Sequence, residues 1–168
     1  MTGNELKQDF DISEMISQNR HIHFMQEALK EAQKAYAAEE IPIGAVIVLK
    51  DRIIARAHNQ VEKLSDATAH AEMIAITAAS GYLGSKFLDE CEMYVTVEPC
   101  LMCAGALYWS RIGKVYYGAS DNRFGYTRTD KNIFGKNINV QRGILADECS
   151  KLILEFFRKK RDADGLFK

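Results

Sequence analysis

The stretch "CEMYVTVEPCLMCAGALYWSRI", residues 91–112, joins a predicted strand to a predicted helix. Residues 91–98 alternate in polarity and are rich in β-branched side chains, which is typical of a strand. Pro99 has the fixed backbone angle that suits the first position of a helix, and we predict that the helix begins there. Cys100 and Cys103 stand three residues apart in this helix, so their sulfurs lie on one helical face. The junction of strand and helix therefore carries a pair of neighbouring thiols.

Strands and helices alternate on both sides of this junction. Two apolar runs flank Lys50 and Asp51, which predicts a hairpin of two strands within residues 41–59. Apolar periodicity and the positions of glycine predict the remaining elements: helices over residues 21–38, 70–80 and 146–161, strands over residues 113–119 and 138–144, and loops over residues 60–68 and 121–136. This order predicts the α/β class, a three-layer α/β/α sandwich around a central, mostly mixed five-stranded sheet.

The composition is that of one globular domain. Apolar residues make up 47% of the 168 residues, and the net charge of −1 excludes a chain that is basic throughout. No apolar run is long enough to cross a bilayer, and residues 1–20 lack the apolar centre of a signal peptide. We therefore predict a cytoplasmic protein without membrane segments, in which a loosely ordered leader of residues 1–20 precedes a single domain of residues 21–168.

The four cysteines divide into two kinds. Cys91 and Cys149 fall on predicted core positions, where a free cysteine acts as a small apolar side chain. The C-x-x-C pair of Cys100 and Cys103 indicates metal binding or redox chemistry in a reducing compartment. A helix N-terminus stabilises the thiolate form that both chemistries need. On its own, the pair fits a thiol–disulfide oxidoreductase as well as a zinc site.

The stretch "TAHAEM", residues 68–73, supplies what a zinc site needs besides two thiolates. His70 is a third ligand, and the sequence offers no convincing fourth. Structural zinc sites have four protein ligands, whereas catalytic sites have three and keep one position for water, whose pKa the metal lowers. Glu72 is placed to take a proton from that water and to deliver it to a substrate nitrogen. We predict one catalytic Zn²⁺ per chain, bound by His70, Cys100 and Cys103, with Glu72 as the catalytic residue.

Each of these residues also has a simpler interpretation when it is taken alone. A histidine at a helix start is commonly a cap, and a glutamate in a first turn commonly interacts with the helix dipole. Here H-x-E precedes P-C-x-x-C, and each motif opens a predicted helix. This combination is the known pattern of the zinc-dependent nucleobase deaminases. The combined pattern therefore favours a catalytic zinc site.

Beyond the motif, the sequence resembles the bacterial tRNA-specific adenosine deaminases of the cytidine deaminase-like superfamily. The likeness extends from about Phe24 to Arg161 and includes "IPIGAVIV", "MYVTVEPCLMCAGAL" and "SRIGKVYYGASD". The ending "GILADECSKLILEFFRKKR" is the part that points to the tRNA-editing branch. The resemblance implies a cytidine deaminase-like fold and a homodimer. It also implies zinc-dependent hydrolytic deamination of adenosine to inosine at the wobble position of a tRNA anticodon stem-loop.

The resemblance further implies which residues contact the substrate. Asn59 and the backbone N–H of Ala71 would bind the flipped base, and Asp121 would lie beside the flanking nucleotides. Phe157 and Arg158 would belong to the last helix, which borders the RNA. Asn59 can both donate and accept hydrogen bonds, as reading a purine edge requires, but it equally suits a loop cap, and Asp121 equally suits a turn.

One segment departs from the family pattern. After Asp121 the family has a loop rich in glycine and alanine, whereas this chain has "NRFGYTRTDKNIFGKNINV", residues 122–140. Its aromatic residues, Phe124, Tyr126 and Phe134, are interleaved with basic ones. Aromatic and basic side chains suit single-stranded RNA. They equally suit a packed loop that covers the site.

Two other functions remain as alternatives. A deaminase of a free base or nucleoside, such as guanine or cytosine, would use the same zinc site, and an oxidoreductase would use Cys100 and Cys103 without zinc. The last helix bears on the first alternative. Phe156 has the spacing of a core residue, whereas Phe157 falls off that face and is free to stack on an RNA base. Arg158 and the basic residues after it would add phosphate contacts.

Overall fold

Helices and strands alternate along the chain as the sequence predicts. The computed structural model describes the backbone of residues 3–163 and the side chains of residues 13–163. Its elements are α1 (Gly3–Ala37), β1 (Gly44–Leu49), β2 (Arg52–His58), α2 (Val61–Leu64), α3 (Ala71–Leu83), β3 (Cys91–Val97), α4 (Leu101–Trp109), β4 (Lys114–Ala119), the 3-10 turn η1 (Tyr126–Arg128), β5 (Asn139–Arg142) and α5 (Ala146–Ala163).

The five strands form one mixed sheet in the order β2-β1-β3-β4-β5. β1 is antiparallel to both β2 and β3, whereas β3, β4 and β5 are parallel. Lys50 and Asp51 connect β1 to β2 with φ angles of 47° and 62°. Two successive positive φ angles match the twist of the flanking strands in a tight hairpin. The predicted hairpin and the predicted mixed sheet are both confirmed.

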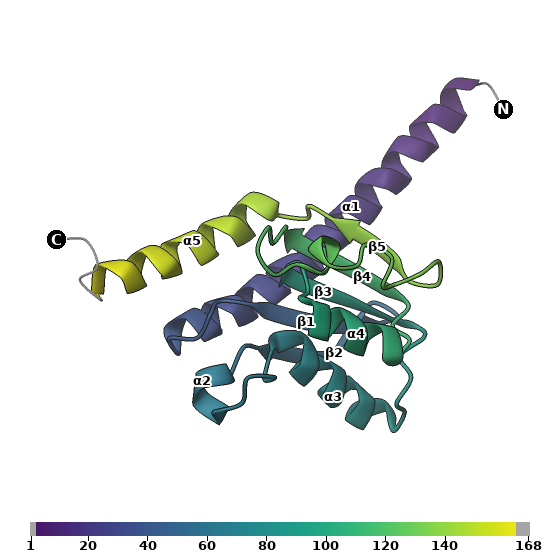
Figure 1. Cartoon of the computed structure of the whole chain (residues 1–168). Coiled ribbons are helices and arrows are strands. Elements are labelled where there is room, and N and C mark those ends of the chain that lie inside the picture. Colours follow the sequence, from purple (N-terminus) through teal and green to yellow (C-terminus); the bar gives the residue numbers. More distant parts are fainter. Residues whose placement is uncertain (1–2, 164–168) are drawn as a thin grey trace.

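Helices cover both faces of the sheet and make a three-layer sandwich (Figure 1). Because successive strand residues point to opposite faces, neighbouring residues of one strand belong to different cores. The core beneath α1 and α5 contains Phe24, Met25, Ala28, Val46, Val48, Tyr94, Tyr116 and Cys149. The core beneath α3 and α4 contains Ala45, Ile47, Ala71, Ala75, Met93, Val95, Ala104, Leu107, Val115 and Tyr117. The predicted three-layer architecture is confirmed.

Helix α1 is longer than predicted. It begins at Gly3 rather than near residue 21. No proline or glycine occurs between residues 4 and 37, so the chain has no residue that would end the helix earlier. The predicted leader is therefore helical from residue 3, and this part projects away from the sheet (Figure 1). Despite the length of α1, no described helix is apolar enough over a sufficient span to cross a membrane.

The packed part of α1 begins with Arg20. Its guanidinium donates to Glu92 Oε2 at 2.7 Å, to the Tyr94 hydroxyl at 2.8 Å and to Asp51 at 2.5 Å. Burial alone would raise the pKa of Glu92, but hydrogen bonds from Arg20 and Lys114 outweigh burial and lower it. These contacts fix α1 against β3 and the β1–β2 turn.

One edge of the sheet collects the segments that carry the predicted site. The parallel strands β3, β4 and β5 all end at this edge, which we call the carboxyl edge. β1 is antiparallel to β3 and begins there, and β2 is antiparallel to β1 and ends there. The chain leaves the carboxyl edge toward α3, toward α4 and into the loop after β4. Residues that follow β2, β3 and β4 can therefore meet in space.

Candidate active site

Three side chains with metal-binding atoms meet at the carboxyl edge. His70 Nδ1 lies 3.6 Å from Cys100 Sγ and 3.5 Å from Cys103 Sγ. The three atoms all lie within 4.8 Å of one another, and the described residues contain no other such group of histidine, cysteine and acidic side chains. Zinc–sulfur and zinc–nitrogen bonds of roughly 2.3 and 2.0 Å at a tetrahedral angle separate nitrogen from sulfur by about 3.5 Å. The spacing of these atoms therefore fits a tetrahedral zinc site.

The helix starts leave these side chains free to bind a metal. His70 is the N-cap residue of α3 and Cys100 that of α4, and neither side chain caps its own helix. Cys103 stands three residues after Cys100, and the side chains of these two helical positions adjoin. The structure also corrects the predicted start of this helix, because α4 begins at Leu101 and Pro99 lies before the N-cap residue.

The two thiols differ in their protonation. A hydrogen bond from Cys103 lowers the pKa of Cys100 to about 4. The same hydrogen bond, together with burial, raises the pKa of Cys103. The hydrogen bond to Cys100 raises the pKa of His70 more than burial lowers it. A divalent cation between the sulfurs would displace the proton of Cys103, because metal-bound thiols are deprotonated.

Glu72 lies in the first turn of α3, and its side chain is only 3% exposed. Burial raises its pKa to about 7, and a carboxyl group with such a pKa can both accept and release a proton near neutral pH. Its Oε2 atom is buried and has no hydrogen-bond partner among the described residues. Because an unpaired buried oxygen is unfavourable, this atom is suited to a water molecule or a substrate group in the site.

Asn59 and Ala71, both predicted to bind the base, contact each other. Asn59 follows β2, is 2% exposed, and accepts a hydrogen bond at Oδ1 from the Ala71 N–H at 2.9 Å. The bond ties the end of β2 to the start of α3 and so helps to position His70. Asn59 therefore has the loop-capping role that the sequence analysis kept as its alternative. Contact of either residue with a base stays a prediction, and for Asn59 it would use the amide nitrogen.

Asp121 begins the loop after β4. Its Oδ1 accepts hydrogen bonds from the N–H groups of Arg123 at 2.8 Å and Phe124 at 3.1 Å. This arrangement is an Asx turn, in which a side chain takes the place of a backbone acceptor. Asp121 thus shapes the loop as a turn residue. Its contact with flanking nucleotides stays a prediction.

Glu98, which the sequence reasoning missed, anchors the same loop. Its buried carboxylate accepts hydrogen bonds from the N–H of Asp121 at 3.1 Å, the N–H of Thr127 at 3.1 Å and the hydroxyl of Thr127 at 2.7 Å. Glu98 stands two residues before Cys100, so it holds the loop beside a metal ligand. The position of Glu98 directly before P-C-x-x-C indicates a residue close to the site. Its role in the loop is not visible in the sequence, because its partners Asp121 and Thr127 follow 23 and 29 residues later, within an irregular loop.

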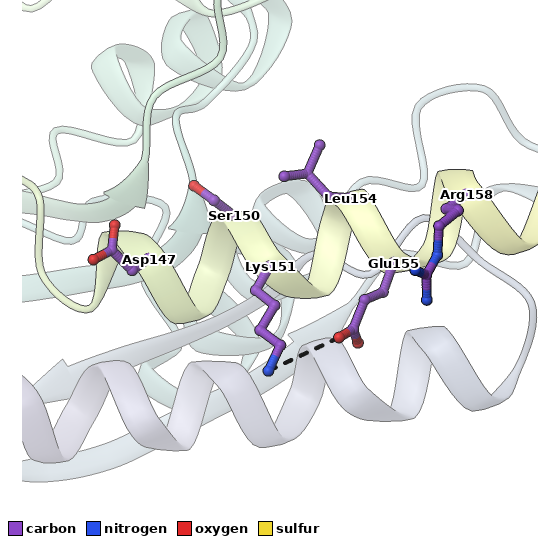
Figure 2. A pocket seen from close by; sticks show the side chains of 6 residues that line it. All are labelled: Asp147, Ser150, Lys151, Leu154, Glu155 and Arg158. Atoms are coloured by element: carbon purple, nitrogen blue, oxygen red, sulfur yellow. Dashed lines mark ion pairs between the residues drawn. The ribbon is translucent and has the colours of Figure 1, made fainter.

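Helix α5 reaches the carboxyl edge from the opposite layer. α1 leads into the start of β1 at this edge, and Tyr36 near the end of α1 contacts Phe156, with ring centroids 5.8 Å apart. Phe156 is buried and Phe157 is 40% exposed, as their spacing predicts. Arg158 is exposed at one end of a surface pocket of about 300 Å³ that α5 alone lines (Figure 2). No metal ligand lines this pocket, which makes it a feature separate from the candidate zinc site.

Comparison with known protein sequences agrees with the geometry. The cytidine and deoxycytidylate deaminase zinc-binding region matches residues 18–119. The tRNA-specific adenosine deaminase of Aquifex aeolicus (strain VF5) is 45% identical over 144 residues, which cover 83% of this chain and 95% of that protein. The tRNA-specific adenosine deaminase of Bacillus subtilis (strain 168) is 45% identical over 82% of this chain and 89% of that protein.

Solved structures share the fold. A structure from a study of A-to-I editing by tRNA:A34 deaminases at the wobble position has a TM-score of 0.73 and 41% identity, over 77% of this chain and 98% of that one. A guanine deaminase from Bacillus subtilis has a TM-score of 0.59 and 35% identity, over 82% of this chain and 92% of that one. Taken with the ligand geometry and the buried glutamate, these similarities show that the chain belongs to the tRNA-specific adenosine deaminases, within the family defined by the cytidine and deoxycytidylate deaminase zinc-binding region.

Proposed function

We propose that the protein converts adenosine to inosine at the wobble position of a tRNA anticodon stem-loop, in a hydrolysis that requires one zinc ion per chain. The observation that carries the proposal is the buried carboxyl group of Glu72, which contacts the Cys103 side chain and leaves its Oε2 without a partner among the described residues, together with the grouped ligand atoms of His70, Cys100 and Cys103. A zinc ion supplies an acidified water molecule when it is bound by three such ligands. The 45% identity to tRNA-specific adenosine deaminases supports the choice of substrate.

Glu72 moves the protons of the reaction. It accepts one proton as water adds to C6 of adenine, and it passes this proton to N1. Glu72 then takes the proton of the hydroxyl group now on C6 and delivers it to the amino group, so that the C6–N6 bond breaks and the C6 carbonyl of inosine forms. Adenosine and water thus give inosine and ammonia. A pKa of about 7 lets the same carboxyl group act as base and as acid, and its burial keeps bulk water from competing for the proton.

The end of α5 offers an exposed aromatic and basic surface that RNA could contact. Phe157 is exposed near the point where α5 meets the end of α1, and the basic residues 158–161 follow it, all of them exposed. Exposed aromatic rings stack on splayed bases, and basic side chains contact phosphates. An anticodon loop is already single-stranded, which reduces the unstacking cost of extruding its base. These features support a tRNA hairpin over a free nucleobase.

The proposal includes a homodimer. Leu101, Tyr108 and Trp109 on α4 are 42%, 43% and 78% exposed, and grouped exposed apolar side chains mark surfaces that a partner covers. We expect sedimentation analysis to give a dimer and Trp109→Ala to weaken it. We also assign the activity to a single domain of residues 21–168 and its location to the cytoplasm, where tRNA is found.

The test compares substrates directly. Zinc-loaded protein is given an anticodon hairpin with adenosine at the wobble position and, in parallel, free adenosine, guanine and cytosine. We expect inosine in the hairpin and no ammonia from the free compounds. Ammonia from guanine alone would favour the second candidate function, guanine deamination. The 35% identity to the guanine deaminase from Bacillus subtilis is the reason to consider it. Thiol–disulfide exchange by a protein without zinc would instead support the oxidoreductase.

A further inference from the structure

The three aromatic residues of the loop after β4 have different surroundings. Tyr126 and Phe134 are 5% and 3% exposed and contact each other edge to face, with ring centroids 4.9 Å apart. Phe124 is 67% exposed. Two of the three aromatics thus pack the loop against the domain, and only Phe124 offers its ring to solvent.

Backbone hydrogen bonds join the loop after β4 to the segment that carries the zinc ligand Cys100. The Tyr126 N–H donates to the carbonyl oxygen of Pro99 at 2.9 Å. Gly125 forms an antiparallel bridge with Cys100. Phe124 immediately precedes Gly125, so its backbone stands beside the zinc ligand segment rather than at the far end of a long loop.

The backbone of Phe124 is also held in place. Its N–H donates to Asp121 Oδ1 at 3.1 Å, and the N–H of Asp121 donates in turn to Glu98 Oε2 at 3.1 Å. Gly125 leaves no room for a side chain, since a Cβ atom there would lie 2.5 Å from the Glu98 carboxylate. These hydrogen bonds hold the backbone that carries the exposed Phe124 ring. Because a surface that is already formed loses less conformational freedom on binding, this arrangement favours binding of a ligand to the ring.

Arg123 completes the surface. Its guanidinium carbon lies 5.3 Å from the centroid of the Phe124 ring, within the range of a cation–π contact. Arg128, in contrast, is tied to the loop, where its Nη1 donates to the carbonyl oxygen of Asn122 at 2.6 Å. An exposed ring beside an arginine is the combination that stacks a base and contacts its phosphate.

We propose that Phe124 and Arg123 form a stacking surface for a nucleobase that flanks the target adenosine. The inference rests on the proposed function, because a free base has no flanking nucleotide. It assigns a role to the segment in which this chain departs from the family pattern. It also separates Phe124 from Tyr126 and Phe134, which serve the packing of the loop.

The test measures hairpin binding in a Glu72→Gln background, so that no turnover interferes. We expect Phe124→Ala to weaken binding of an anticodon hairpin by about 5- to 150-fold, the usual effect of losing one stacked base. Phe124→Tyr keeps a ring and should bind as the parent does, whereas Phe124→Leu keeps only apolar bulk and should not. Arg123→Gln should lower the salt dependence of binding by about one phosphate contact.

A matched control comes from α3. Tyr82 is 64% exposed and lies at the end of the helix remote from His70, so Tyr82→Ala should bind the hairpin as the parent does. Hairpin binding by Phe124→Ala within twofold of the parent, with the wild-type enzyme active on the hairpin, would overturn the stacking surface alone. Absence of both hairpin binding and hairpin deamination in the zinc-loaded wild type would overturn the proposed function, and this inference with it.

Discussion

Replacing Glu98 by alanine removes the carboxylate that holds the loop after β4 beside the metal ligands. The side chain is 5% exposed and accepts three hydrogen bonds, two of them from backbone N–H groups of Asp121 and Thr127. The substitution leaves these two partly buried N–H groups without a protein acceptor. We therefore expect a loss of stability together with a looser loop.

The size of the effect follows from the three bonds at 3.1, 3.1 and 2.7 Å. A hydrogen bond to a charged group contributes about 1.5–3 kcal/mol, and removing one partner leaves the other unsatisfied. Water that enters the space left by Glu98 can accept some of the lost hydrogen bonds and so restores part of their free energy. We therefore expect the free energy of unfolding to fall by about 3 kcal/mol. For a chain of this length, that corresponds to a melting temperature lower by about 6–12 °C.

Thermal unfolding of the zinc-loaded variants measures this directly. Thr127→Val is the matched control, because it removes only the hydroxyl bond and should cost about 1.5 kcal/mol, the lower value for one bond to a charged group. Hydrogen exchange at the N–H groups of Asp121 and Thr127 should accelerate in Glu98→Ala and not in a variant destabilised elsewhere. A Glu98→Ala protein that melts within about 2 °C of the wild type, with unchanged exchange at both groups, would refute the anchoring role.

Three further outcomes are expected. Glu72→Gln should keep about one zinc per chain and slow deamination by about 10²–10⁴-fold; retention of near-normal turnover would contradict its role as the proton carrier. Cys103→Ala should lose zinc by metal analysis and melt at a lower temperature, and unchanged zinc content would argue against this ligand. Because Arg20 and Lys114 lower the pKa of Glu92, the folded state holds fewer protons there than the unfolded chain, and stability present above the ordinary pKa is lost as pH falls through the lowered one. Glu92→Gln should therefore flatten the acid limb of a stability–pH curve; a curve parallel to that of the wild type would contradict this assignment.

The elements that the sequence predicts well are those fixed by local patterns. The alternation of "CEMYVTVE" predicts β3, and the turn residues Lys50 and Asp51 predict the β1–β2 hairpin. His70, Cys100 and Cys103 were found because each stands at a helix start within a short motif. Chemistry that depends on short spacing is visible in a sequence, since secondary structure converts that spacing into distance.

The features that the sequence did not predict depend on contacts between distant residues. Helix α2 lies in a predicted loop, and the buried carboxylate of Glu40 accepts hydrogen bonds from its Glu62 and Lys63 N–H groups. Glu98 acts in the same way on the loop after β4. No local pattern reports such pairs. Likewise, exposure alone distinguishes Phe124 from Tyr126, and exposure follows from the packed fold.

The position of inosine in a treated hairpin tests the central claim most directly. The zinc-loaded protein is given an anticodon hairpin with one adenosine at the wobble position and another elsewhere in the loop, and the product is sequenced while ammonia is measured. The account predicts inosine at the wobble position alone, one ammonia per inosine, and neither product with Glu72→Gln. No inosine from the wild-type protein, or equal conversion of both adenosines, would contradict it.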